Sequence, residues 1–255
     1  MTLHVETTGE GPDVVLLHGW GMHAGIWDGI ARELARSFRV HAVDLPGYGA
    51  SAACTPYTLG RIAQELVANL PSRCHACGWS LGGEVALAWA RCAPRQVMRL
   101  ALIATTPCFA RRGDWPHAVE ADVLHDFAQA LATDCDGTLQ RFLALQAQGD
   151  GQSKQVVRRL RQTLFARGRP GAAVLQQGLE ILLGTDLRRE LHLIGQPALV
   201  VHGDRDGLTP PAAGEYLGRM LPNARRVVMA GAAHAPFVSD AKGVGALLGE
   251  FFDER

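Results

Sequence analysis

The segment Gly78-Trp79-Ser80-Leu81-Gly82 constrains the fold of this chain more than any other feature of its sequence. An apolar run leads into it, and the residues from Glu84 to Ala90 that follow have the composition of a helix. The pattern G-x-S-x-G between a strand and a helix is typical of a sharp turn that presents the serine hydroxyl, and the glycines leave room for that turn. We therefore predict that Ser80 is a nucleophile at the end of a buried strand.

Short apolar runs that end in turn residues recur along the chain, at residues 14–17, 40–43, 99–104, 198–201 and 226–229. Such runs are typical of strands buried on both faces of a parallel sheet. Helical patterns lie between them, at residues 26–38, 59–70, 84–91, 212–221 and 244–252. Alternating strands and helices predict a doubly wound fold of the α/β class, with a mostly parallel sheet flanked by helices.

This alternation stops after residue 108, where helical patterns follow one another with no convincing strand. The patterns cover residues 118–131, 138–148, 155–165 and 172–183. Helices inserted between two strands predict a cap over the carboxyl edge of the sheet, where open α/β sheets bind ligands. The predicted organisation is a core of residues 1–108 and 186–255 with a helical cap, or lid, at residues 109–185.

A serine hydroxyl needs a base to remove its proton, and the base needs a carboxylate to hold its tautomer. In this architecture the acid and then the histidine follow the serine along the chain. Asp206 begins a turn that Pro210 closes after one predicted strand, and His234 lies on a small-residue loop after the next. The predicted catalytic triad is Ser80, His234 and Asp206.

Each of the two partners has a rival nearby. Asp204 is a second carboxylate on the acid turn, and we expect it to cap that turn instead. His202 is the rival base, and it is disfavoured because it precedes the acid along the chain.

The negative oxygen of an acyl-transfer intermediate needs two backbone N–H donors. Leu81, at the start of the predicted helix, supplies one, and Trp20 in the loop 18–21 is placed to supply the other. The alternative for Trp20 is a large side chain that covers the loop. We expect His18 to hydrogen-bond this loop rather than take part in the chemistry.

Composition argues against several other classes of protein. The chain carries 25 basic and 25 acidic residues, so its balanced charge argues against nucleic acid as a partner. It has neither a signal-peptide pattern nor a run of the roughly 20 apolar residues that a membrane span needs, so we expect no membrane partner and a cytoplasmic protein. Cys74 and Cys77 form a C-x-x-C pair without the second pair of a zinc site, and we interpret them as core thiols.

Nine short segments carry a resemblance to a known family: LLHGWG (16–21), VDLPGYG (43–49), GWSLGG (78–83), TTPCF (105–109), RFLALQ (141–146), GLEIL (178–182), DLR (186–188), DGLTP (206–210) and AAHAPF (232–237). Together they resemble the BioH family, the pimeloyl-[acyl-carrier protein] methyl ester esterases of biotin synthesis, which have an α/β-hydrolase fold. Many α/β-hydrolases share the first three patterns. TTPCF, RFLALQ and GLEIL are more selective, because they lie at the edges of the predicted cap and within it.

The resemblance implies the same triad, with Trp20 and Leu81 at the oxyanion and substrate-contacting positions. It also implies that one cap segment lines the acyl channel, namely Phe142, Leu143, Ala144, Leu145 and Gln146. Phe142 and Leu145 are three residues apart and would share a helix face. The alternative is that this face is simply the core of the cap.

The charge of the cap is uneven. From residue 141 to 169 one acid, Asp150, stands against seven basic residues: Arg141, Lys154, Arg158, Arg159, Arg161, Arg167 and Arg169. Acyl carrier proteins are strongly acidic, so the resemblance implies that this surface docks one, with Arg141, Lys154, Arg158 and Arg159 as candidate contacts. The alternative is an ordinary solvated face. Gly137, one helical turn before Arg141, is a departure where the family can carry another arginine.

The predicted activity is hydrolysis of the methyl ester of pimeloyl-acyl carrier protein by a serine carboxylesterase that needs no metal or organic cofactor and acts as a monomer. The alternative on the same triad is a general short-chain carboxylesterase, a lactonase or a carbon–carbon bond hydrolase without specificity for the carrier. An alternative of another class is a binding or receptor protein with the same fold.

Overall fold

The computed structural model describes residues 2–167 and 169–254. Within them, a seven-stranded sheet has the order β1-β3-β2-β4-β5-β6-β7. The strands are β1 (Val5–Thr8), β2 (Asp13–Leu17), β3 (Arg39–Val43), β4 (Cys74–Trp79), β5 (Val97–Ile103), β6 (Ala198–Gly203) and β7 (Ala224–Met229). Every neighbouring pair is parallel except β1 with β3. The predicted α/β class is confirmed.

Strand β1 was not expected from the sequence. It pairs antiparallel with β3, with Val5 opposite Val43 and Thr8 opposite Val40. Its residues are half-buried or exposed, because an edge strand has a neighbour on one side only. An edge strand of this kind lacks the continuous apolar run by which the central strands are recognised.

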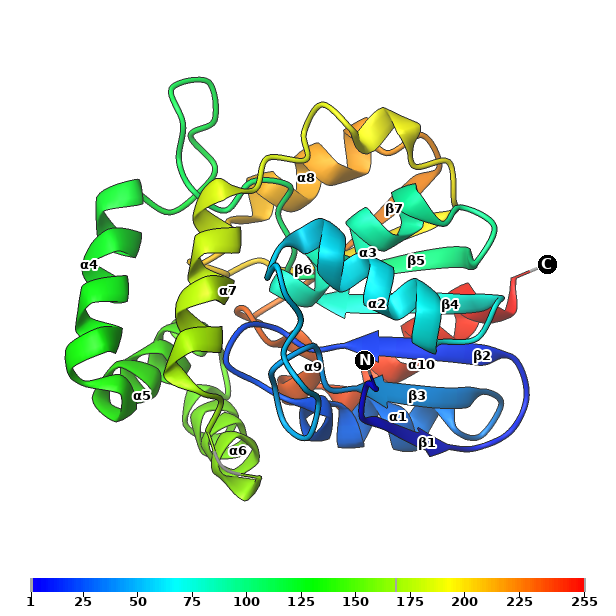
Figure 1. The fold of residues 1–255 in the computed structure, drawn as a ribbon. Helices are drawn as coiled ribbons and strands as arrows, with labels where there is room; N and C mark the ends of the chain where they lie inside the picture. The colour runs from blue at the N-terminus through cyan, green and yellow to red at the C-terminus, as the bar shows by residue number, and fades with distance from the viewer. Residues whose placement is uncertain (1, 168, 255) are drawn as a thin grey trace.

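Helices cover both faces of the sheet. In Figure 1, α2 and α3 lie in front of the sheet and α10 lies behind it, where it packs against α1. Helix α8 packs against β6 and β7. The bounds are η1 (Ala24–Trp27), α1 (Asp28–Leu34), α2 (Leu59–Asn69), α3 (Leu81–Cys92), η2 (Leu191–Leu193), α8 (Pro211–Met220), α9 (Pro236–Ser239) and α10 (Ala241–Asp253).

Four further helices, which we call the cap helices, lie between β5 and β6. They are α4 (Ala121–Thr133), α5 (Cys135–Gln146), α6 (Ser153–Ala166) and α7 (Ala172–Gly184). Figure 1 shows them as a green to yellow layer beyond the carboxyl ends of the central strands. None of the described helices is both long enough and apolar enough to cross a membrane.

The two cysteines of the C-x-x-C pair lie in β4 and are free thiols. Both are buried, and burial raises the pKa of the Cys74 thiol to about 12. Residues three apart on a strand point to opposite faces of the sheet. Cys74 and Cys77 therefore pack in separate layers of the core.

Candidate active site

Ser80 occupies the turn between β4 and α3 in a strained conformation, with φ 55° and ψ −121°. A side chain on Gly78 would overlap the carbonyl oxygen of Gly82, and one on Gly82 would overlap the carbonyl oxygen of Leu17. The Ser80 N–H donates to the carbonyl oxygen of Ile103 at 3.0 Å, which ties the turn to β5. The glycines thus let the chain turn sharply enough to place Ser80 at the carboxyl edge of the sheet.

The loop 18–21, which we call the oxyanion loop, lies directly against this serine. A Cβ atom on Gly19 would be 3.3 Å from the Cβ of Ser80. Within residues 2–167 and 169–254, the N–H groups of Trp20 and Leu81 donate no hydrogen bond. Leu81 is the first residue of α3, where N–H groups have no partner within the helix. Both predicted oxyanion donors are therefore left without an acceptor in the described part of the chain.

His18 holds this loop in place. Its Nε2 accepts from the Leu45 N–H at 3.0 Å, so Nδ1 carries the proton and donates to the Gly19 carbonyl oxygen at 2.8 Å. Burial lowers the pKa of His18 to about 4, so the ring is neutral at physiological pH. His18 hydrogen-bonds the loop, as the sequence predicts.

Asp206 and His234 meet at the ends of β6 and β7. His234 Nδ1 lies 2.9 Å from Asp206 Oδ2, and both residues are almost completely buried. Asp206 Oδ1 accepts from the backbone N–H groups of Leu208 and Thr209, each at 2.9 Å, and the Thr209 hydroxyl donates to Oδ2 at 2.7 Å. Burial alone would raise the pKa of Asp206, but His234 and these hydrogen bonds outweigh it and hold the pKa below its ordinary value.

Trp79 connects this pair to the serine turn. Its indole Nε1 donates to the His234 carbonyl oxygen at 2.8 Å, and the two rings lie 5.7 Å apart. Among the described residues, no hydrogen bond joins the Ser80 hydroxyl to the imidazole. Such bonds are often long in unliganded sites and shorten when substrate binds. The structure thus gathers the three predicted triad residues at one edge of the sheet.

The two rivals have other partners. Asp204 Oδ1 accepts from the Gly231 N–H at 2.7 Å, so the expectation that it caps its own turn is wrong. The N–H groups of that turn are already taken by Asp206 Oδ1. His202 is fully buried, and its Nε2 lies 2.8 Å from the Thr209 carbonyl oxygen and 3.7 Å from Asp206 Oδ2. Burial lowers the pKa of His202, and its ring contacts Thr209 of the acid turn.

The five predicted channel residues divide between the interior and the surface. Phe142 packs edge-on against Trp20, with ring centroids 4.9 Å apart, and Leu143 is buried. Gln146 is buried as well, and neither its amide nitrogen nor its amide oxygen has a partner in the described part of the chain. Ala144 and Leu145 are exposed and line a groove on the outer surface of the cap.

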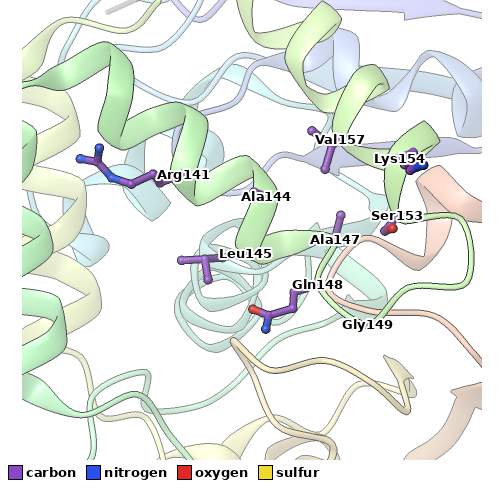
Figure 2. A pocket seen from close by; sticks show the side chains of 9 residues that line it. All are labelled: Arg141, Ala144, Leu145, Ala147, Gln148, Gly149, Ser153, Lys154 and Val157. Carbon is purple, nitrogen blue, oxygen red and sulfur yellow. The ribbon is translucent and has the colours of Figure 1, made fainter.

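This groove lies between α5 and α6 and has a volume of about 860 Å³. Figure 2 shows Arg141 and Lys154 on opposite sides of it. Its lining residues are Arg141, Ala144, Leu145, Ala147, Gln148, Gly149, Ser153, Lys154 and Val157. The groove therefore combines an apolar floor with positive charges at its rim.

The seven basic residues between positions 141 and 169 fall into two groups. Four are paired with acids: Arg141 with Asp134, Arg159 with Asp28, Arg167 with Glu6 and Arg169 with Asp136. The other three, Lys154, Arg158 and Arg161, recur along α6 at a spacing that places them on one face. Within the described ranges these three form no ion pair. Of the predicted docking residues, Lys154 and Arg158 are thus unpaired, whereas Arg159 is paired with Asp28 of the core.

No group of three or more histidine, cysteine, aspartate or glutamate side chains is arranged to hold a metal ion among the residues that the structure describes. Thr209 is the contributor to the acid site that sequence reasoning missed. The signal in the sequence is the position of Thr209 three residues after Asp206, because an aspartate side chain commonly accepts a hydrogen bond from the backbone of the turn that follows it.

Comparison with known proteins gives a consistent result. The profile of the alpha/beta hydrolase fold matches residues 12–241. The pimeloyl-[acyl-carrier protein] methyl ester esterase of Nitrosomonas europaea is 46% identical over 238 residues, covering 93% of this chain and 94% of that protein. The proteins of the same name from Aeromonas hydrophila and Stenotrophomonas maltophilia are 45% and 43% identical, covering 94% and 98% of this chain and 94% and 96% of their own lengths.

Solved structures share the fold at low sequence identity. A bromoperoxidase from Bacillus anthracis superposes with a TM-score of 0.91 at 20% identity, covering 99% of this chain and 95% of its own. An esterase from Exiguobacterium antarcticum superposes with a TM-score of 0.87 at 23% identity, covering 99% and 96%. At these identities the likeness shows the fold alone. By its profile match and its relatives, the chain belongs to the alpha/beta hydrolase fold family and, within it, to the BioH family.

Proposed function

We propose that this protein is a serine carboxylesterase that hydrolyses the methyl ester of pimeloyl-acyl carrier protein to pimeloyl-acyl carrier protein and methanol. The observation that carries the proposal is the similarity to esterases of that name, which extends over the cap as well as the core. The strained serine turn and the buried Asp206–His234 pair support the reaction type.

In the first half of the reaction, the Ser80 oxygen attacks the ester carbonyl carbon while His234 Nε2 takes the hydroxyl proton. The negative charge develops on the carbonyl oxygen, which accepts hydrogen bonds from the N–H groups of Trp20 and Leu81. The bond to the methoxy group then breaks, and His234 gives the proton to the leaving oxygen. Methanol departs and an acyl-enzyme remains on Ser80.

In the second half, a water molecule attacks the acyl-enzyme and His234 takes one of its protons. The bond to Ser80 breaks, and the serine oxygen receives that proton from His234. The product leaves as a carboxylic acid that loses its proton to solvent. Asp206 stays ionised throughout and stabilises the imidazolium, which its lowered pKa supports.

Docking of the carrier protein would use the outer surface of the cap. The groove and the unpaired cations Lys154 and Arg158 support this assignment, because an acyl carrier protein is acidic. The paired Arg141 lines the same groove, whereas Arg159 is engaged with Asp28. In this proposal residues 109–185 act as a cap on a core of residues 1–108 and 186–255, with the channel lined by residues 142–146, and the protein works as a cytoplasmic monomer.

The test compares two substrates in one preparation. We expect turnover of the methyl ester on the carrier protein at a higher kcat/KM than that of p-nitrophenyl esters. A protein that showed no preference for the carrier would be a general carboxylesterase instead.

Labelling by a fluorophosphonate probe tests the nucleophile. We expect labelling of the wild type and none of the Ser80→Ala variant, with Ser51→Ala as a control that stays labelled. Absence of labelling in the wild type would favour a binding protein with this fold.

A further inference from the structure

The α5–α6 linker, residues 147–152, connects the two cap helices that border the groove. Its neighbour on the inner side is the loop that carries His234. The Gly151 N–H donates to the Gly231 carbonyl oxygen at 2.9 Å, and the Gly149 carbonyl oxygen accepts from Arg205 Nη1 at 3.1 Å. The linker is therefore bonded both to the histidine loop and to the residue that precedes Asp206.

Within this linker, the side chain of Asp150 accepts three hydrogen bonds. It is 7% exposed, and its Oδ2 accepts from the Ala233 N–H at 3.1 Å and from the Ser239 hydroxyl at 2.6 Å. Its Oδ1 accepts from the Gln152 N–H at 2.7 Å, which fixes the carboxylate within its own linker. The single acid of segment 141–169 thus forms no ion pair in the described part of the chain and is bonded to backbone N–H and hydroxyl groups instead.

The main chain of His234 is held by the residues around it. Its N–H donates to the carbonyl oxygen of Gln146 at 3.1 Å, at the end of α5. Its carbonyl oxygen accepts from Trp79, next to the nucleophile. Asp150 holds the preceding peptide group through the Ala233 N–H. Two of these three contacts come from the cap, so the cap contributes to the placement of the imidazole.

We propose that Asp150 is a positioning residue for the catalytic histidine: its buried carboxylate fixes the peptide before His234 and so aligns the imidazole with Ser80. This inference rests on the proposed role of His234 as the base. A hydrogen bond to an ionised acceptor is stronger than one between neutral groups, and loss of Asp150 leaves the buried Ala233 N–H unpaired. The hydrogen bonds of Asp150 go to Gln152, Ala233 and Ser239 and none to the oxyanion donors, so it acts on the rate of reaction and not on the binding of a small ester.

The experiment measures hydrolysis of p-nitrophenyl acetate and the rate of fluorophosphonate labelling in the full chain. For Asp150→Ala we expect kcat to fall by roughly 10- to 100-fold, because a displacement of a catalytic group of about 1 Å has an effect of this order. KM should stay within about twofold of the wild-type value, and the labelling rate should fall with kcat.

Two further variants complete the series. Asp150→Asn keeps the size and one acceptor oxygen, which can turn toward Ala233 and Ser239, so we expect a smaller, severalfold loss of kcat. Asp136→Ala is the matched control, because Asp136 is an exposed acid of the same cap and is paired with Arg169. This control should retain the wild-type kcat.

Thermal unfolding of each variant shows whether it is folded, and Asp150→Asn decides the question if Asp150→Ala does not fold. A folded Asp150 variant with the wild-type kcat, or with a raised KM and an unchanged kcat, would overturn the inference. A wild-type protein that is not labelled at Ser80 would overturn the proposed function and this inference with it. A labelled wild type with fully active Asp150 variants would overturn this inference alone.

Discussion

The buried imidazole of His18 ties the oxyanion loop to the chain that follows β3. Both of its ring nitrogens are used, one toward Leu45 and one toward Gly19. A proton on the second nitrogen would break the bond from the Leu45 N–H. Burial disfavours the charged ring and lowers the pKa of His18 from 6.5, the value of an unperturbed ring, to about 4.

This shift predicts a loss of stability in acid. Between pH 6.5 and pH 4 the unfolded chain binds a proton at His18 and the folded chain does not, so the free energy of unfolding falls as the pH is lowered. The full effect of this one group is about 3 kcal/mol. In His18→Gln, the amide oxygen can accept from Leu45 without titrating. Urea unfolding should show the wild type losing stability relative to this variant from pH 7 to pH 4, and parallel curves would contradict the assignment.

Glu84, one helical turn after Ser80, is a buried group whose pKa shifts in the opposite direction to that of His18. It is fully buried, and neither carboxyl oxygen has a hydrogen-bond partner in the described ranges. Burial raises its pKa well above the ordinary value of 4.5, so the folded protein favours the neutral acid.

A raised carboxyl pKa makes the folded state less stable as the pH rises, because the unfolded chain loses its proton first. We expect Glu84→Gln, which has nearly the same shape and no titration, to gain stability relative to the wild type between pH 5 and pH 8. The measurement is the urea midpoint at both pH values. A constant difference would mean that Glu84 is ionised in the folded protein.

At the scale of elements, the cap helix α7 anchors the oxyanion loop through a hydrogen bond from Trp20. The Trp20 indole Nε1 donates to the Leu175 carbonyl oxygen at 2.9 Å, so the side chain of a predicted oxyanion residue is anchored in the cap. Gly178, one turn further along α7, makes this approach possible. A Cβ atom there would lie 2.8 Å from Trp20 Cδ1 and 2.8 Å from the Tyr48 hydroxyl oxygen. The glycine of the GLEIL segment is thus required by packing.

The variant Gly178→Ala should therefore displace Trp20 and lower the free energy of unfolding by about 1–3 kcal/mol, the usual range for an overpacked site. Because Trp20 carries an oxyanion donor in our proposal, fluorophosphonate labelling should slow as well. Gly184→Ala in the same helix is the matched control, since nothing lies within 4 Å of its added Cβ. Equal unfolding midpoints for the two variants would contradict the packing argument.

At the scale of the whole molecule, the formal net charge is zero but the charged residues are unevenly distributed. Acids and bases balance over the sequence, yet α6 presents Lys154, Arg158 and Arg161 on one face. Unpaired cations beside an apolar groove can attract an acidic protein over a distance, an effect that salt screens.

Charge reversal at two neighbouring residues tests this surface. We expect Arg158→Glu to raise KM for the carrier-bound ester severalfold and to leave p-nitrophenyl acetate turnover unchanged. Arg159→Glu should have the smaller effect on KM, because Arg159 is paired with Asp28. Added salt should raise the wild-type KM for the carrier ester. Equal effects of both variants on both substrates would contradict docking on this face.

Most elements of this fold are visible in the sequence because each has a strong local pattern. The central strands are continuous apolar runs, since helices cover both faces of the sheet. The amphipathic pattern of α6 predicts a helix at the surface of the cap. Strand β1 was missed because an edge strand is held by pairing with one neighbour and does not need a continuous apolar run.

The site divides in the same way. The G-x-S-x-G turn, the acid turn and the histidine loop are local sequence patterns, and their order along the chain is enough to predict which residues belong together. The bond from Asp204 to Gly231 and the one from Asp150 to Ala233 join residues 27 and 83 positions apart. No local pattern predicts such a pair.

The sequence by itself determined the α/β class and the serine turn and predicted the residues of the triad, because short-range sterics and hydrophobic periodicity act within a few residues. The tertiary structure decided that Asp204 bonds to Gly231, which cations of the cap remain unpaired, and that Asp150 is bonded to the histidine loop. These depend on distances between segments that only the packing of the cap on the sheet brings together. The residue type sets the chemistry of a side chain, whereas the fold determines which groups that side chain contacts.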